Sequence, residues 1–313
     1  MVSSVFDALI GQSQAVELLM AAIERDRIAP AYLFVGIPGI GRSLAAQGFA
    51  ELLLSPKGLV SPQLRSRIEQ RNHPDLFWVE PTYLHQGKRI SVKEAAELGV
   101  KRKTPPQIRL DQVREIAQFL GRPPLEAERA VVVLEQAESM ADAAANGLLK
   151  TLEEPGKATL ILIASSVDAL LPTIVSRCQR VRFQRLSTKD VAAVLRRSGH
   201  EDVLQHPEIL ALAQGSPGEA IAHWQQLQTI DLELLETVTQ PPRSLRHALE
   251  LARQIDKELD VEAQLWFVDY LQHRYWQQQT HPQFLHLLET ARRHLRGSVQ
   301  SRLTWEVTLM GML

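Results

Sequence analysis

The stretch 31-AYLFVGIPGIGRS-43 decides the fold of this chain. Its first five residues form an apolar run typical of a buried strand, and the run leads into a glycine-rich turn. From Ser43 onward, SLAAQGFAELLL is typical of a helix. The turn itself, 36-GIPGIGRS-43, has the spacing of the phosphate-binding pattern G-x-x-x-x-G-K-[ST], with arginine in the lysine position. Strand, loop and helix in this order predict an α/β domain that can cradle phosphate.

The segments around this loop continue the alternation of strands and helices. Further strands are predicted at 76-LFWVE-80, 130-AVVVL-134, 159-TLILIA-164 and 180-RVRF-183. Residues 109–120 have apolar side chains at helical spacing, and a second helix is predicted from about 141 to 154, where Pro155 ends it. Near-continuous apolar strands between helices favour a parallel sheet that is covered on both faces. Residues 1–185 are therefore predicted to form an open α/β sheet.

Strand patterns stop at Leu186, and the remainder is predicted to be helical. Short helices are expected over 186–240, and the pair Pro241-Pro242 is a plausible linker. Longer helices are predicted over 241–313. Four of the five tryptophans lie in this helical part, where they are expected to pack in the core or between helices. The predicted domains are thus 1–185, 186–240 and 241–313.

Composition excludes several classes of protein. Lys and Arg number 35 against 36 Asp and Glu, so the chain does not bind polyanions through bulk charge. The single cysteine, Cys178, excludes an internal disulfide framework and a cysteine-rich zinc site. The start has no secretory pattern, and the longest apolar runs are too short to span a bilayer. A cytoplasmic protein is predicted.

A polar, basic insert occupies residues 82–107 within the α/β half. Its cationic residues outnumber Glu94 and Glu97, and they are Lys88, Arg89, Lys93, Lys101, Arg102 and Lys103. Such an insert is typical of a solvated surface excursion. Contact with DNA or an acidic partner is the alternative that the sequence leaves open.

A phosphate-binding loop works by aiming backbone N–H groups and a helix N-terminus at phosphate oxygens. Its lysine reaches the β- and γ-phosphates, and the next Ser or Thr holds Mg²⁺. This chain keeps the cradle residues Gly36, Gly39, Gly41 and Ser43. Arg42 replaces the lysine, and its planar fork is a poor substitute for a compact point charge.

The segment 131-VVVLEQAESM-140 carries a second departure from an active site. ATPases with this loop place an Asp after this strand for Mg²⁺ and often a Glu beside it to activate water. Here Glu135 stands at the Asp position and Gln136 at the Glu position. Because an amide does not accept a proton at neutral pH, the hydrolytic site is predicted to be disabled.

Five segments carry a family resemblance: 6-FDALIGQSQAVELLMAAI, 28-IAPAYLFVGIPGIGRS, 73-HPDLFWVEP, 146-NGLLKTLEEP and 172-PTIVSRCQRVRF. Together they resemble the bacterial clamp-loader branch of the AAA+ proteins. The most specific parts are LLKTLEEP and the triplet Ser176-Arg177-Cys178. The resemblance implies an α/β AAA+ module with phosphate-loop topology, a small helical lid and an all-α collar.

The same resemblance implies a function and partners. A clamp loader of this branch is a five-subunit ring of tau/gamma, delta and related subunits, which uses ATP to load the sliding clamp onto primed DNA. Arg177 matches the residue that such rings present to the γ-phosphate of a neighbouring subunit. A structural arginine paired with an acidic side chain is the alternative. Cys178 is expected to be a buried small residue, and Ser165 and Ser166 occupy the place of a polar nucleotide-sensing residue.

Departures from the active members of the branch favour an accessory role. Gly218, in 215-GSPGEA-220, occupies the place of a nucleotide-sensing lid arginine. The four cysteines of a zinc module found in many relatives are missing, so the segment from about 54 to 72 must be held without that metal. We therefore predict a non-hydrolysing subunit that requires no cofactor. An active tau/gamma-like ATPase is the alternative, and the sequence does not decide whether ATP or ADP still binds.

Overall fold

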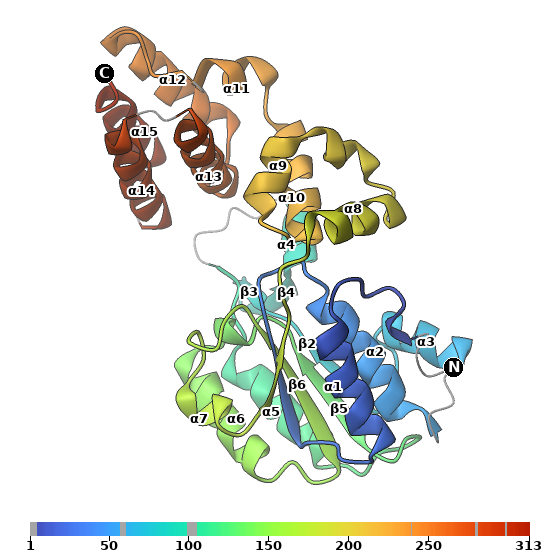
Figure 1. Ribbon diagram of the computed structural model, residues 1–313. Coiled ribbons are helices and arrows are strands. Elements are labelled where there is room, and N and C mark those ends of the chain that lie inside the picture. Colours follow the sequence, from blue (N-terminus) through green and yellow to red (C-terminus); the bar gives the residue numbers. More distant parts are fainter. Residues whose placement is uncertain (1–4, 57–60, 99–104, 239, 279–280, 298) are drawn as a thin grey trace. The chain divides into compact units, whose positions relative to one another are not determined.

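The computed structural model describes residues 5–56, 61–98, 105–238, 240–278, 281–297 and 299–313 (Figure 1). Contacts along the chain divide it into two compact units, residues 1–190 and 191–313. None of the helices within the described ranges is long and apolar enough to cross a bilayer.

A five-stranded sheet in the order β2-β5-β6-β1-β7 forms the centre of the first unit, and all neighbouring strands are parallel. The strands are β1 (Ala31–Val35), β2 (Leu76–Val79), β5 (Ala130–Leu134), β6 (Ala158–Ala164) and β7 (Gln179–Arg182). All five strands predicted from the sequence are present, and the parallel α/β sheet is confirmed.

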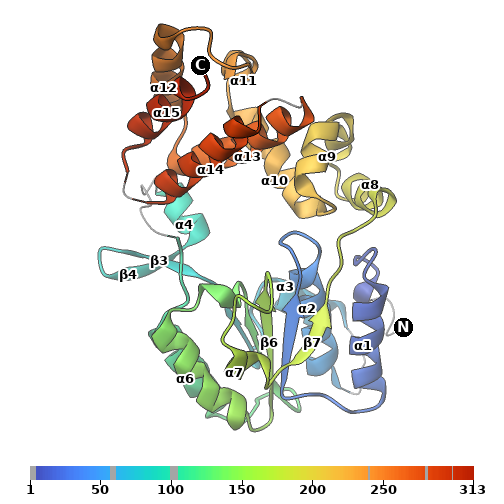
Figure 2. The same cartoon turned by 60° about the vertical axis from the view of Figure 1, so that its left-hand side comes forward.

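Helices cover both faces of this sheet, as Figure 2 shows for α1 on one side and α6 and α7 on the other. Alternate residues of β1 point to opposite faces. Tyr32 packs edge-on against Phe49 of α2, with ring centroids 4.9 Å apart. Leu33 joins the opposite core with Ile116 and Leu148. The helices of the two layers are α1 (Ser13–Glu24), α2 (Arg42–Leu54), α5 (Leu110–Leu120), α6 (Asp142–Glu153) and α7 (Pro172–Val175).

The segment predicted to lack a zinc module contains the helix α3 (Pro62–Glu69). Ser61 caps this helix, and its hydroxyl accepts a hydrogen bond from the Leu64 backbone N–H at 3.1 Å. Arg65 Nε lies 3.1 Å from Oε1 of Glu51, whose buried carboxylate lies on α2. A helix cap and an ion pair to α2 therefore hold this segment. Residues 57–60 lie outside the described residues.

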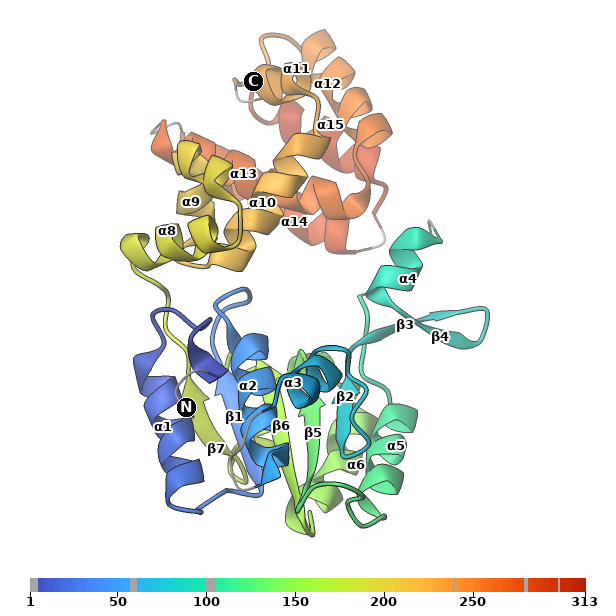
Figure 3. The same ribbon diagram turned by 90° about the vertical axis from the view of Figure 1, so that its right-hand side faces the viewer.

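The described residues of the basic insert, which was predicted to be a solvated surface excursion, form regular elements. The insert contains a hairpin of β3 (Thr82–His85) and β4 (Lys88–Ser91), followed by α4 (Val92–Glu97), and Figure 3 shows it projecting beside β2. Arg89 of β4 pairs with Asp111 and Glu115 of α5, at 3.1 Å to Asp111. One cation of the insert is therefore used within the fold. Lys101, Arg102 and Lys103 lie outside the described residues.

Helices alone build the described part of the second unit. After α8 (Thr188–Arg197), which crosses the boundary, they are α9 (Pro207–Ala213), α10 (Pro217–Thr229), α11 (Leu232–Val238), α12 (Leu245–Glu258), α13 (Val261–Gln277), α14 (Pro282–Arg296) and α15 (Ser301–Met310). α12 packs against α15, and α13 packs against α14. The predicted helical remainder is confirmed.

One apolar core runs through most of this unit. Trp305 is fully buried in it, and Trp266 packs against it. Trp276 is 67% exposed, so its predicted packing in the core or between helices is wrong. Leu234 and Val238 of α11 belong to the same core as α12 to α15. The predicted division of the helical part at 240/241 stays a prediction.

Candidate functional site

The glycine loop follows β1 at the carboxyl end of the parallel strands, where α/β sheets bind ligands. Gly39 and Gly41 have φ angles of 73° and 98°, which L residues with side chains rarely adopt. A Cβ at Gly36 would lie 2.8 Å from the carbonyl oxygen of Phe183, just after β7. The loop therefore needs its glycines, and a backbone cradle of the predicted kind is present.

A buried glutamine ties this loop to the end of β7. Gln12 is 3% exposed, and its Nε2 donates to the carbonyls of Ile40 at 3.3 Å and Gln184 at 2.8 Å. Its Oε1 accepts from the Gln184 backbone N–H at 3.0 Å. We did not predict this role from the sequence, because a polar residue before a helix is typical of an exposed cap and gives no sign of burial.

Arg42 turns inward, toward the sheet. Its Nη1 donates to the carbonyl oxygen of Ala164, the last residue of β6, at 2.5 Å, and the residue is 9% exposed. The same carbonyl accepts the Gly36 backbone N–H at 3.3 Å. The cation that replaces the lysine therefore binds a backbone oxygen of its own domain.

The acidic end of β5 meets the cradle at one point. The Ser43 side chain lies near the carboxylate of Glu135. Burial raises the pKa of Glu135, and the nearby Ser43 hydroxyl opposes this shift. Gln136 is exposed and has a φ angle of 47°, so it begins the short 3₁₀ helix Ala137–Ser139 in a left-handed conformation. The structure thus brings Ser43 and Glu135 together and leaves Gln136 at the surface.

Ser165 and Ser166 follow β6 at the place where a nucleotide-sensing residue was predicted, and a backbone hydrogen bond links this turn to Glu138. The Ser165 backbone N–H donates to Glu138 Oε1 at 3.1 Å, and Ser166 follows in the same partly buried turn. Glu138 also lines a cavity of about 290 Å³ together with Asp142 and Asp168. The sequence pattern gave no sign of the role of Glu138, because its partner is a backbone group contributed by a different strand.

The triplet Ser176-Arg177-Cys178 forms a tight turn after α7. Ser176 Oγ and Arg177 Nη1 each donate to the carbonyl of Thr173 at 3.0 Å. Cys178 packs against the core, and burial raises the pKa of its thiol to about 11, so it stays protonated and unreactive at neutral pH. Hydrogen bonds to Thr173 and burial of Cys178 therefore hold the turn, and 37% of the Arg177 side chain stays exposed.

Arg177 also has an acidic partner, Glu153. Its Nη2 lies 2.7 Å from Oε1 of Glu153, which ends α6. The predicted alternative, an arginine paired with a carboxylate, is thus present in the chain by itself. The exposure of both side chains, 37% and 51%, leaves the guanidinium accessible from solvent.

Two family models cover nearly the whole chain. One is described as "DNA polymerase III, delta subunit" and matches residues 11–187; the other, "Cyanobacterial DNA polymerase III delta prime, C-terminal domain", matches residues 189–312. The chain belongs to the delta-prime family of DNA polymerase III clamp-loader subunits. Within the clamp-loader branch, the delta-prime subunit is also the one that the sequence motifs predict, and the prediction is confirmed.

Curated delta-prime relatives match across much of the chain. The subunit of Bacillus subtilis is 34% identical over 216 residues, which are 67% of this chain and 58% of the relative. That of Pseudomonas aeruginosa is 36% identical over 203 residues, which are 62% of this chain and 55% of the relative. The chain thus spans a little more than half the length of these relatives.

A solved structure supports the fold. A DNA polymerase III gamma-subunit-related protein of Thermotoga maritima aligns with 95% of this chain and 97% of its own, with a TM-score of 0.53 and 18% identity. The clamp-loader assignment of the sequence is confirmed by the family, and the predicted α/β sheet with a helical remainder is confirmed by this fold.

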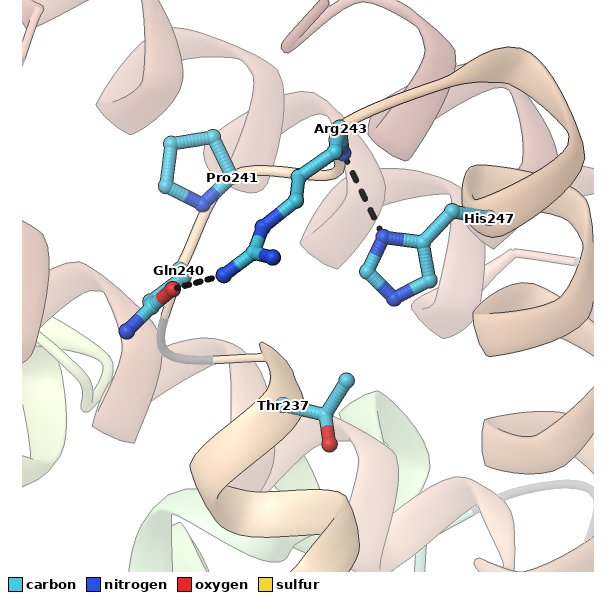
Figure 4. Close-up of a pocket in the computed structure, with 5 residues that line it drawn as sticks. All are labelled: Thr237, Gln240, Pro241, Arg243 and His247. Carbon is cyan, nitrogen blue, oxygen red and sulfur yellow. Dashed lines mark hydrogen bonds between the residues drawn. The ribbon is translucent and has the colours of Figure 1, made fainter.

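Two features of this delta-prime chain lie in the second unit. Gly218, at the place of the lid arginine, is the second residue of α10, whose N-cap Ser216 accepts from Glu219 N–H at 3.2 Å. A separate pocket of about 510 Å³ lies between α11 and α12 (Figure 4). It is lined by Thr237, Gln240, Pro241, Arg243 and His247. Arg243 Nη2 donates to Gln240 Oε1 at 3.4 Å within it. We assign this pocket no part in nucleotide chemistry.

Proposed function

We propose that this chain is a non-hydrolysing subunit of a bacterial clamp loader, which assists ATP-driven loading of the sliding clamp onto primed DNA. In this proposal it joins tau/gamma and delta subunits in a five-subunit ring in the cytoplasm and requires no cofactor of its own. It supplies Arg177 to the ATP site of a neighbouring subunit. The helices beyond residue 241 provide its main assembly surface.

The inward turn of Arg42 supports this proposal most strongly. A lysine at this position stabilises the transferring phosphoryl group, whereas Arg42 donates to the Ala164 carbonyl and is nearly buried. Gln136 removes a second contribution, because its amide does not activate water. The chain thus lacks both the lysine and the water-activating carboxylate of an active site, but it keeps the triplet Ser176-Arg177-Cys178. This combination favours a subunit that acts on a neighbour's ATP.

The isolated chain should therefore release phosphate from ATP only at the background rate. Loss of a general base alone typically lowers a rate by ~10²–10⁴-fold. A phosphate-release assay on the purified chain checks this expectation. A steady turnover of about 1 s⁻¹, a usual enzyme rate, that Ser43→Ala or Glu135→Ala abolishes would instead show an active site.

One observation favours nucleotide binding by this chain, which the active-ATPase alternative also requires. The cradle glycines keep their left-handed conformations, and Ser43 still lies near Glu135. Nucleotide binding without turnover is compatible with this geometry. Calorimetric titration with ATP and ADP, compared between the wild type and Arg42→Lys, separates an empty site from one that binds nucleotide without hydrolysing it.

Arg177 is tested in reconstituted rings. An arginine supplied in trans stabilises the charge on the transferring phosphoryl group by ~10³–10⁵ in rate. Because this arginine would complete only one of several sites, Arg177→Ala should lower total clamp- and DNA-stimulated ATPase in part and clamp loading more. Arg177→Lys should not rescue, since a point charge lacks the bidentate fork. Identical ATPase and loading at equal assembly would make Arg177 a structural residue.

A further inference from the structure

The guanidinium of Arg177 is held at two points within its own chain. Nη2 donates to Glu153 Oε1 at 2.7 Å, and Nη1 donates to the Thr173 carbonyl at 3.0 Å. These bonds use two of the five N–H groups that a guanidinium carries in a fixed planar fork. Two contacts on different nitrogens fix both the position and the plane of the group.

Stability does not explain the pair of Glu153 and Arg177. Both side chains are exposed, and surface ion pairs of this kind contribute little to folding. Glu153 is also the last residue of α6, where the negative end of the helix dipole disfavours a carboxylate. A glutamate at this place is therefore unfavourable locally, and its contact lies with a residue 24 positions further along the chain.

We propose that Glu153 is a positioning residue, which holds the Arg177 guanidinium in the orientation in which it enters the neighbouring subunit's ATP site. This inference rests on the proposed function of Arg177. A free arginine side chain loses much rotamer freedom when it docks, whereas one already fixed by Glu153 and Thr173 loses less. The N–H groups that face away from these two contacts are the ones that remain for the phosphate oxygens.

Rings assembled from the full chain with its tau/gamma and delta subunits test this role. Glu153→Ala should lower the kcat of the Arg177-dependent ATPase and the clamp-loading rate roughly 3- to 10-fold, well within the ~10² that a misplacement of about 1 Å can cost. The KM for ATP should stay unchanged, because the contact acts in the transition state. Glu153→Gln keeps an acceptor oxygen without the charge, so its ATPase rate should lie between those of Glu153→Ala and wild type.

A double variant shows whether Glu153 acts through Arg177. Arg177→Ala with Glu153→Ala should be no slower than Arg177→Ala alone, since the second change then has nothing to position. Glu154→Ala is the matched control, because Glu154 is the next residue, is also exposed, and should leave the rates at the wild-type value. Unchanged melting temperatures of the variants confirm that each chain folds.

Three results would overturn the inference while leaving the proposed function intact. They are a full rate for Glu153→Ala beside a slow Arg177→Ala, an additive loss in the double variant, and a faster ring with Glu153→Ala, which would make Glu153 a restraint on Arg177. A normal rate for Arg177→Ala itself overturns the proposed function and this inference together.

Discussion

Arg42 shows how one residue changes the use of a phosphate-binding loop. The loop around it keeps the form of a phosphate cradle, but its guanidinium donates to a backbone carbonyl at the end of β6. The sequence alone predicts that the lysine's function is weakened, because the residue type is visible. It does not predict where the guanidinium goes, since the acceptor is a backbone carbonyl 122 residues further along the chain.

This contact should contribute to folding stability. Arg42→Met keeps most of the apolar stem and removes the buried hydrogen bond, so we expect a loss of roughly 1–3 kcal/mol in the free energy of unfolding. Arg42→Ala should cost more, because packing is lost as well. Urea denaturation measures both, with Arg114→Ala on the exposed face of α5 as the control, expected within about 0.5 kcal/mol of wild type. Equal stability of Arg42→Met and wild type would contradict a structural role for the contact.

At the scale of elements, Asp75 explains how β2 and β5 are joined. Its buried carboxylate accepts hydrogen bonds from the backbone N–H groups of Leu125, Glu126 and Ala127, at 2.6, 2.8 and 2.8 Å. Burial alone would raise the pKa of Asp75, but these three bonds outweigh it and the pKa is lowered. The loop before β5 is thereby pinned to the start of β2.

The pinning predicts a pH dependence with a defined sign. Because the folded-state pKa of Asp75 lies below the unfolded value of about 3.9, its stabilisation is present above that pH and is lost as pH falls through the folded value. Asp75→Asn should therefore be less stable than wild type at pH 7, by roughly 1–3 kcal/mol, and the difference should shrink below about pH 4. Urea unfolding across pH checks this, with exposed Glu128→Gln as the control. A difference that does not change with pH would show that the charge of Asp75 is irrelevant.

Some elements can be predicted from their sequence and others cannot. Buried strands such as β5 and β6 are apolar throughout, so their composition predicts burial on both faces. The β3–β4 hairpin is polar, and its turn is Gln86-Gly87 with φ angles of 48° and 78°. Asn-Gly would have signalled such a turn clearly, whereas Gln-Gly does so only weakly. The partners of Gln12 and Glu138 escaped prediction for another reason: they are backbone groups that only the folded topology brings near.

At the scale of the whole molecule, assembly depends on surfaces that the single chain leaves uncovered. α12 and α15 pack against each other, and each exposes an apolar pair at i and i+4 spacing. These pairs are Leu245 and Leu249 on α12, and Leu303 and Val307 on α15, with exposures of 55%, 38%, 50% and 53%. Exposed apolar pairs at this spacing are typical of helix surfaces that take part in an interface. They lie within the region proposed as the collar.

Charged residues at this surface should prevent assembly without unfolding the chain. Leu303→Asp combined with Val307→Asp changes two half-exposed side chains, so the isolated protein should keep its circular dichroism and melt within a few degrees of wild type. Burying two carboxylates in an apolar interface is costly, so size-exclusion chromatography should find the variant outside the tau/gamma–delta ring. Gln283→Asp on the exposed face of α14 should co-assemble normally.

Substitution is preferable to truncation at 240, because truncation would expose Leu234 and Val238, which are buried in the core of the second unit. If the double variant enters the ring as well as wild type does, the ring contacts lie elsewhere, and the collar assignment fails even if Arg177 acts as proposed.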